Sequence, residues 1–341
     1  MTQHRTDREP TPPDKAKRDI TCHALDSEQI AIESRTDIEP LELTVCICSF
    51  RRPSLLSTIE SVGRQLALAT ANVRILIIDN DHEPTARNIA AEFDSRTSMR
   101  VDYRHVPGQD ISTARNAGLD ATPTPWLAFV DDDEFASANW LAELVANRNG
   151  ANAVFGPCEA IYDDWVPDWI KQGDYHSNRI VESPITTGYT SNVLIDMFFV
   201  RRHGLRFEPE LGRTGGEDTV FFHAMYRKGG VLKYAPNAVV YERVAPSRAN
   251  VRWVVRRRYR AGQTRALMFH KSDRVDYRRL SWVAPLKVVA CAIMSVVTSA
   301  NRPRAIWWLM RGIFHCGTIS YAIGAGVHEE YGKPAVFAKK N

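Results

Sequence analysis

The sequence predicts an α/β fold in which a mainly parallel β-sheet carries helices on both faces. Between residues 43 and 147, short apolar runs rich in β-branched residues alternate with stretches whose apolar residues recur at helical spacing. Strands that alternate with helices in this way form βαβ units, which build parallel sheets covered on both sides. Hydrophobic residues make up 44% of the 341 residues and charged residues 25%, which is ordinary for a globular protein and excludes a disordered or fibrous chain.

The first half of the chain contains four predicted strands, each followed by a predicted helix. The strands are apolar runs at 43–50, 73–78, 101–106 and 126–130, and the helices cover 54–69, 84–93, 112–119 and 140–147. Pro53 and Ser54 supply a start for the first of these helices. After residue 150 the pattern is mixed: 153–156, 191–195 and 231–241 are typical of strands, and 219–228 is typical of a helix.

Composition divides the chain into three parts. Residues 1–40 are rich in Thr, Pro and charged residues, and we expect a disordered N-terminal tail there. Residues 41–265 hold the strand and helix pattern of a globular domain, and 266–341 form a basic and apolar helical region. Its two apolar stretches, 282–300 and 305–325, are each interrupted by charge, Pro or Gly. Neither offers about 20 unbroken apolar residues, so we expect amphipathic helices that lie against a membrane surface or pack on the globular domain. The alternative is a single spanning helix or a re-entrant hairpin.

The charge of the chain is nearly balanced overall but unevenly distributed. The 44 basic and 40 acidic residues give a net charge of +4, which does not point to nucleic acid as a partner. Between residues 243 and 279, however, twelve Arg or Lys residues stand against two Asp. Such a stretch is attracted to anionic lipid. The six cysteines are scattered, form no CxxC pair and follow no secretory signal, so a reducing cytoplasmic location is expected.

Four carboxylates follow the predicted strand at 126–130. Because side chains alternate along a strand, Asp131 and Asp133 are expected to point into one cleft. Ligands bind beyond the carboxyl ends of the strands in such sheets, and Asp79 ends another predicted strand. Carboxylates without His or Cys suit Mg²⁺ or Mn²⁺ bridging a diphosphate. The alternative is a solvated acidic turn.

Five motifs follow one another along the chain: VCICSFR at 45–51, IIDN at 77–80, STARNAG at 112–118, WLAFVDDDE at 126–134 and GGED at 215–218. The third and fourth are similar to the ARNxG and FxDxDD signature of family-2 glycosyltransferases, whose GT-A fold is Rossmann-like. The other three resemble that family's first strand and loop, its second strand and its ED motif. The resemblance covers about residues 43–265, the expected catalytic domain. The sequence also resembles the bacterial exopolysaccharide glucosyltransferases of the succinoglycan type.

The resemblance implies roles for the residues of these motifs. Asp131 and Asp133 would hold Mg²⁺ or Mn²⁺, and Asp218 would be the general base, with Glu217 as the fallback. The nucleotide sugar would be bound by a larger set of side chains. These are Ser49, Arg51, Asp79, Arg115, Asp131, Asn192, Arg257, Arg258 and Gln263. Arg115 would bridge the diphosphate and the acidic cluster, or alternatively pair with a local carboxylate on a helix surface. Alternatively, the basic run at 256–260 is a solvent-exposed face that does not bind the nucleotide sugar.

The implied activity is transfer of one sugar, with inversion, from a nucleotide sugar such as a UDP-hexose to a lipid-linked saccharide in cell-surface polysaccharide synthesis. The QxxRW motif of processive relatives is absent, which favours single-sugar addition. Such an acceptor places the enzyme on the cytoplasmic side of the cell membrane, as a peripheral or monotopic protein. Two alternatives are a metal-dependent nucleotidyltransferase, although no Gly-rich, Lys-bearing loop is present, and a non-catalytic module that binds lipid or nucleic acid.

Overall fold

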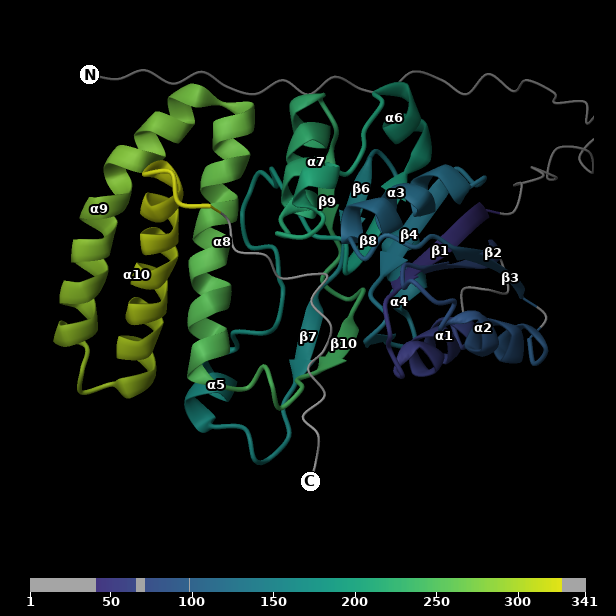
Figure 1. The fold of residues 1–341 in the computed structure, drawn as a ribbon, viewed down its shortest axis with the longest axis horizontal. Helices are drawn as coiled ribbons and strands as arrows, with labels where there is room; N and C mark the ends of the chain where they lie inside the picture. The colour runs from purple at the N-terminus through teal and green to yellow at the C-terminus, as the bar shows by residue number, and fades with distance from the viewer. Residues whose placement is uncertain (1–40, 66–70, 98, 327–341) are drawn as a thin grey trace, which may run out of the picture. The chain divides into compact units, whose positions relative to one another are not determined.

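A seven-stranded sheet lies at the centre of the protein, with its strands in the order β3-β2-β1-β4-β8-β6-β9 (Figure 1). The computed structural model describes residues 41–65, 71–97 and 99–326, so the expected tail at 1–40 lies outside the described residues. The strands are β1 (Leu41–Ser49), β2 (Ala71–Asp79), β3 (Arg100–His105), β4 (Trp126–Val130), β6 (Ala153–Phe155), β8 (Asn192–Asp196) and β9 (Leu232–Tyr234). All neighbours pair in parallel except β8, which runs antiparallel to both β4 and β6. The prediction of a mainly parallel sheet is confirmed.

Helices cover both faces of this sheet because its strands are apolar on both sides. On one face, Val45 and Ile47 of β1 pack against α1, α2 and α4, while Cys46 faces the opposite core with α3, α6 and α7. The helices are α1 (Leu55–Gly63), α2 (Arg87–Asp94), α3 (Ile111–Ala121), α4 (Trp140–Ala146), α6 (Met197–Arg202) and α7 (Glu217–Arg227). The helix predicted over 54–69 ends at Gly63, and 66–69 lie outside the described residues.

A second, three-stranded sheet has the order β5-β10-β7. It consists of β5 (Glu134–Ala136), β7 (Cys158–Ile161) and β10 (Val240–Arg243). The prediction of one strand over 231–241 is therefore wrong, because β9 and β10 belong to different sheets. Pro236 and Asn237 form the turn that separates them, as expected of this residue pair.

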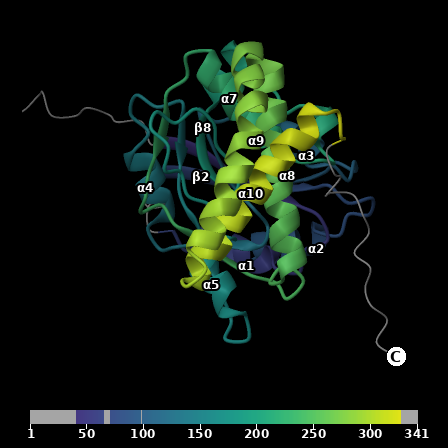
Figure 2. The same cartoon turned by 90° about the vertical axis from the view of Figure 1, so that its left-hand side faces the viewer.

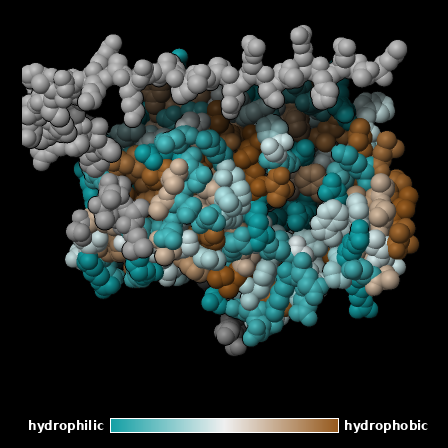
Figure 3. Space-filling model, turned by 180° about the vertical axis from the view of Figure 1, so that it is seen from behind, coloured by the Kyte–Doolittle hydropathy of each residue, from teal (hydrophilic) through white to brown (hydrophobic). Residues whose placement is uncertain are grey.

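Three long helices follow the sheets: α8 (Val251–Ser272), α9 (Arg274–Val297) and α10 (Arg302–Ala322). α10 packs against both α8 and α9, and α9 forms the outer layer (Figures 1 and 2). The expected boundary between 265 and 266 falls inside α8, which continues through the buried Ala266 and Leu267. Among the described residues, α9 alone is long and apolar enough to cross a membrane by length and composition. Much of its outer surface is hydrophobic (Figure 3).

Two glycines allow α8 and α10 to approach closely. A Cβ atom on Gly262 would lie 1.8 Å from the carbonyl oxygen of Phe314, and one on Gly317 would lie 1.9 Å from that of Tyr259. Both distances are far below van der Waals contact. Because each obstacle is backbone, only a movement of one helix could relieve the clash.

Replacing Gly317 by Ala is therefore expected to lower the free energy of unfolding by about 1–3 kcal/mol through overpacking. This loss should exceed the gain of about 1 kcal/mol in helix propensity. Urea unfolding followed by circular dichroism measures it. Gly312→Ala on the same helix is the control, since the nearest atom to its added Cβ is Cys291 Cβ at 3.3 Å. Equal stability of the two variants would show that the helices do not cross at Gly317.

Candidate active site

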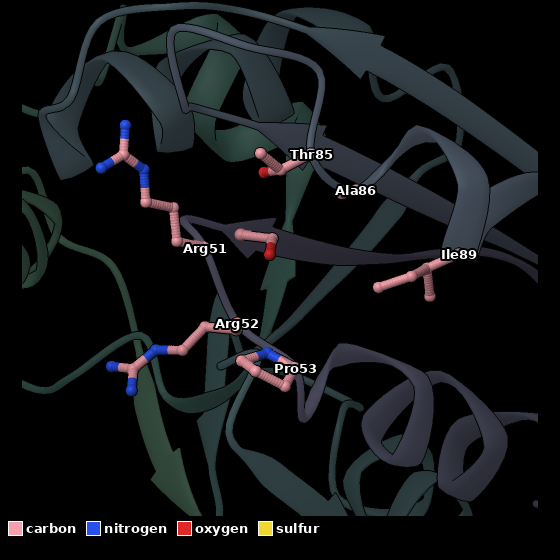
Figure 4. Close-up of a pocket in the computed structure, with 7 residues that line it drawn as sticks. Arg51, Arg52, Pro53, Thr85, Ala86 and Ile89 are labelled. Carbon is pink, nitrogen blue, oxygen red and sulfur yellow. The ribbon is translucent and has the colours of Figure 1, made fainter. Parts of the chain in front are cut away.

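A pocket of about 190 Å³ opens where β1 and β2 end. Its walls come from the loop after β1 and from the segment that leads into α2 (Figure 4). The lining residues are Ser49, Arg51, Arg52, Pro53, Thr85, Ala86 and Ile89. Ser49 and Arg51, both predicted to line the nucleotide pocket, are among them. The pocket lies at the carboxyl ends of parallel strands, where α/β sheets bind ligands.

Arg51 is fixed by a bidentate ion pair. Its Nε and Nη2 donate to the two carboxylate oxygens of Asp81 at 2.7 and 2.9 Å. This hydrogen-bonded pairing lowers the pKa of Asp81, whereas burial acts in the opposite direction. Arg51 has a φ of 54°, a left-handed conformation that costs free energy for a residue with a Cβ. The ion pair therefore holds a strained turn at the pocket's edge.

Asp79 lies in the interior beneath this pocket. It is fully buried, and its carboxylate accepts hydrogen bonds from the backbone N–H of Ala86 and the hydroxyl of Tyr103, both at 2.8 Å. The backbone N–H of Asp81 donates to it as well, at 3.3 Å. The structure therefore places Asp79 under the loop that forms one wall of the pocket, and not among the residues that line it.

The carboxylates after β4 point in different directions. Asp132 is buried against the first loop, where it accepts a hydrogen bond from the backbone N–H of Phe50 at 3.1 Å. Asp131 and Asp133 are partly exposed and close enough to raise each other's electrostatic energy. Residues 131–133 form a turn after β4 and do not continue the strand from which the alternation was expected. In this turn Asp132 holds the loop of Arg51 and Arg52, while Asp131 and Asp133 remain partly exposed.

Two arginines hold Asp133. Its Oδ2 lies 3.2 Å from Nη2 of Arg52 and 3.3 Å from Nη2 of Arg248. Arg248 also pairs with Glu242 at the end of β10. Sequence reasoning missed Arg52 and Arg248. Arg52 directly follows a predicted site residue, and Arg248 stands in the basic stretch, but neither belongs to a recognised motif.

Arg115 joins two of the predicted motifs. It is buried on α3, forms an ion pair with Glu217 at the start of α7, and its Nη2 lies 3.7 Å from Oδ1 of Asp131. Its guanidinium also lies over the ring of Phe207. Arg115 therefore bridges the acidic turn after β4 and the ED segment, which are more than 80 residues apart in the sequence.

Asp218 stands beside this bridge at the first turn of α7. It is partly exposed, accepts a hydrogen bond from its neighbour's backbone N–H, and is close enough to act electrostatically on Asp131. Gly216 caps the helix with a φ of 92°, and a Cβ there would lie 2.5 Å from Thr264 Cγ2. The glycines before the ED pair thus allow α7 to begin close to α8, with Asp218 on the side of the acidic turn.

The surroundings make several of these carboxyls weaker acids. Partial removal from water raises the pKa of Asp131; the charge of Arg115 opposes the rise, and the charges of Asp133 and Asp218 add to it. Burial, reinforced by Asp133, raises the pKa of Asp132 to about 8. Burial raises the pKa of Glu217 as well, with Arg115 opposing. Displaced pKa values in a group of acids are typical of functional sites.

Other predicted residues lie away from this group. Asn192 is fully buried, donates to the carbonyl oxygens of Pro157 and Ala238, and accepts from Trp140 Nε1 at 2.8 Å. These hydrogen bonds occupy the amide of Asn192 inside the protein, so the structure does not place this side chain where it could contact a donor sugar. Gln263 is buried against α10, where it donates to Ser320 Oγ at 3.0 Å.

The two predicted arginines of α8 face different partners. Arg258 lies over the ring of Tyr175, away from the acidic turn. Arg257 donates to Asn178 Oδ1 at 3.1 Å and is close enough to Glu242 to feel its charge. Of the two, only Arg257 is near the network that includes Arg248 and Asp133.

The donor set fits a cation that takes few ligands from the protein. Within the described ranges, no three His, Cys, Asp or Glu side chains form a group that could hold an ion alone. Asp131 and Asp133 nevertheless offer neighbouring carboxylates at the open end of the sheet. Mg²⁺ is commonly bound by one or two carboxylates together with substrate phosphates and water. These two residues suit Mg²⁺ or Mn²⁺ in that manner.

Comparison with known proteins identifies the family of the chain. The family model "Glycosyl transferase family 2" matches residues 44–206. The succinoglycan biosynthesis protein ExoM of Rhizobium meliloti (strain 1021) is 36% identical over 301 residues, which cover 86% of this chain and 97% of that protein. A validoxylamine A glucosyltransferase of Streptomyces hygroscopicus subsp. limoneus is 25% identical over 140 residues, or 40% of this chain and 30% of that protein.

A solved structure supports the fold. The mannosyltransferase PcManGT from Pyrobaculum calidifontis, in complex with GDP-Man and Mn²⁺, superposes with a TM-score of 0.58 at 13% identity, covering 82% of this chain and 86% of that one. The expected GT-A fold is confirmed. With a relative so similar over nearly its whole length, the chain belongs to glycosyltransferase family 2 and is a glycosyl-transferring enzyme.

Proposed function

We propose that this enzyme transfers a single sugar, with inversion, from a nucleotide sugar such as a UDP-hexose to a lipid-linked saccharide in exopolysaccharide synthesis. The family assignment decides against the two alternatives, a nucleotidyltransferase and a non-catalytic module. The observation that carries the proposal is the Arg115 bridge. It joins Asp131, the carboxylate that we propose would bind the cation, to the ED segment.

The two segments that Arg115 joins have different chemical roles in this proposal. Asp218 takes the proton from the acceptor hydroxyl as that oxygen attacks the anomeric carbon of the donor sugar. The attack comes from the face opposite the departing diphosphate and inverts the anomeric centre. Asp131 and Asp133 would hold a divalent cation, which would supply positive charge to the leaving diphosphate. Glu217 stays paired with Arg115 and is thereby a positioning residue in this proposal.

Arg52 and Arg248 are proposed to bind the diphosphate. Both guanidinium groups already contact the carboxylate of Asp133. The diphosphate would lie beside them, because it would bind to the cation that Asp133 would hold. Planar guanidinium groups make bidentate hydrogen bonds to phosphate. The pocket beside Ser49 and Arg51 would take the nucleoside, with Asp79 holding the loop that forms one of its walls.

The donor and acceptor are inferred from the relatives. The relative that is similar over 97% of its own length is a succinoglycan biosynthesis protein, which supports an exopolysaccharide product. A lipid-linked acceptor would require the enzyme to work at the cytoplasmic surface of the cell membrane. We expect Mn²⁺ or Mg²⁺ as the cofactor.

Transfer is tested with the full-length protein, a panel of UDP-hexoses, Mn²⁺ and lipid-linked oligosaccharides extracted from a strain that lacks the gene. We expect one donor to yield a product heavier by a single hexose in mass spectrometry. Nuclear magnetic resonance of the anomeric proton should show a β-linkage from an α-linked donor. A retained α-configuration, or addition of several sugars, would contradict the proposal.

Replacing Asp133 by Ala is expected to remove the dependence of UDP binding on Mn²⁺, because the cation loses a carboxylate ligand. We expect the affinity in the presence of Mn²⁺ to fall by about tenfold or more. Isothermal titration with UDP, with and without Mn²⁺, measures it. Asp102→Ala is the matched control, since Asp102 also sits between two arginines, Arg74 and Arg100. Unchanged Mn²⁺-dependent affinity in the Asp133 variant would reject the metal assignment.

A further inference from the structure

The outward side of α9 carries a continuous apolar stripe, which we term the α9 face. It consists of Trp282, Leu286, Val289, Ile293 and Val296, each between 57% and 81% exposed. Their spacing of four, three, four and three residues places them on one side of the helix. In Figure 3 the hydrophobic side chains of α9 form the right-hand edge of the molecule. An exposed apolar patch of this kind marks an interaction site.

The inner side of α9 is already used. Ala284 and Cys291 are buried, and the helix packs along α10, which in turn packs on α8 (Figure 2). The close approach of α8 and α10 at Gly262 and Gly317 ties the three helices together. Within the described part of the chain, all five residues of the α9 face remain exposed.

The surroundings of the α9 face are strongly basic. Residues 274–322 contain seven Arg or Lys residues and one acidic residue, Asp276. Five of the seven basic residues lie at the two ends of α9: Arg274, Arg278 and Arg279 in its first two turns, and Arg302 and Arg304 just after its end. These five side chains are exposed. An apolar stripe between basic ends has the pattern of a helix that lies in an anionic membrane interface.

We propose that the α9 face docks onto an anionic lipid bilayer, with α9 lying parallel to the membrane surface. A second copy of the chain is a poorer occupant, because a two-fold interface through this face would bring the same basic ends together. Anionic headgroups instead complement them. Trp282 fits the boundary between headgroups and acyl chains, where its ring is apolar and its N–H is polar.

The packing favours a helix that lies on the membrane over one that crosses it. α10 returns alongside α9, so insertion would carry the turn with Arg302 and Arg304 into or across the bilayer. Charged side chains at that depth are costly. Pro285 and Lys287 also interrupt the apolar sequence of α9. Lying flat, α9 buries its stripe while α10 and α8 stay above the membrane and join it to the catalytic sheet.

Vesicle flotation tests the docking. The inference shares the membrane location with the proposed function, but the assay uses neither donor nor acceptor, so loss of transfer and loss of docking are distinguishable. Full-length protein should float with vesicles of phosphatidylcholine and phosphatidylglycerol, and less with phosphatidylcholine alone or at high salt. The double variant Leu286→Ser with Ile293→Ser should bind about tenfold or more weakly. Equal flotation of wild type and variant, or none by the wild type, would overturn the proposal.

The matched control replaces two exposed apolar residues elsewhere, Val181→Ser with Phe198→Ser, which are 90% and 67% exposed. It should float like the wild type, and both double variants should keep the wild-type melting temperature. Light scattering after gel filtration measures the oligomeric state as a second test. A wild-type dimer that only the Leu286 and Ile293 variant converts to a monomer would assign the α9 face to a second copy and overturn membrane docking.

Depth is measured with brominated lipids. The difference in tryptophan quenching between wild type and Trp282→Phe reports on Trp282 alone. Bromines near the headgroup end of the acyl chains should quench it more than bromines near the chain ends. The opposite order would contradict the parallel orientation of α9.

Discussion

Asp218→Asn is expected to abolish sugar transfer while leaving the binding of nucleotide and Mn²⁺ unchanged. The amide has nearly the shape of the carboxylate but cannot accept the proton of the acceptor hydroxyl. Loss of a positioned general base typically costs about 10²–10⁴ in rate. Because Asp218 is not a member of the buried Arg115 and Glu217 ion pair, the substitution should also leave the free energy of unfolding unchanged.

The rate of UDP release under single-turnover conditions measures the loss, and titration with UDP and Mn²⁺ measures binding. Asp168→Asn is the control, since Asp168 also stands exposed in the first turn of a helix, α5 (Asp168–Gly173). It should transfer sugar at the wild-type rate. If the Asp218 variant retains that rate, another group is the base, and Glu217→Gln then becomes the decisive variant.

The large sheet was predictable because its strands are long apolar runs buried on both faces. β1, β2 and β4 contribute Ile47, Ile77 and Phe129 to cores on the two sides of the sheet. The small sheet was not predictable. β5 and β7 are three and four residues long, and β5 begins at Glu134, inside the acidic turn. Pairing between segments about 100 residues apart decides their conformation, and no local pattern carries that information.

Motifs located the acidic turn and the ED segment, but side-chain direction had to come from tertiary structure. The family resemblance implies that Asn192 binds the nucleotide sugar, yet its side chain faces the core and accepts a hydrogen bond from Trp140. Asp79 ends its strand as expected, yet the loop after it folds back and encloses its carboxylate. Arg248 is one of twelve basic residues between 243 and 279, and only the fold brings it to Asp133.

Arg115→Met is expected to cause a large loss of stability, because it leaves the carboxylate of Glu217 buried without its partner. Breaking a buried ion pair in this way costs about 3–5 kcal/mol in the free energy of unfolding. Met retains the volume of the aliphatic stem, so the loss reports mainly on charge. Arg206→Met is the control: its pair with Asp120 is half exposed, and such pairs contribute up to about 1 kcal/mol.

A double-mutant cycle and the pH dependence identify the cause of that loss. Adding Glu217→Gln to Arg115→Met should restore part of the stability, because a neutral amide costs less to bury than a carboxylate.

Burial already raises the pKa of Glu217 and Arg115 opposes the rise, so removing Arg115 raises that pKa further. A carboxyl with a raised pKa in the folded state binds its proton more tightly there than in the unfolded chain. Stability then falls as the pH rises from the unfolded pKa toward the folded one. The single variant should therefore lose more stability at about pH 8 than at about pH 5. The double variant should lose the part of this dependence that Glu217 contributes and keep the part due to Asp131, whose pKa Arg115 also opposes. A loss that is the same at both pH values would show that Arg115 stabilises the protein by packing on Phe207, and that the charge bridge between the acidic turn and the ED segment contributes little.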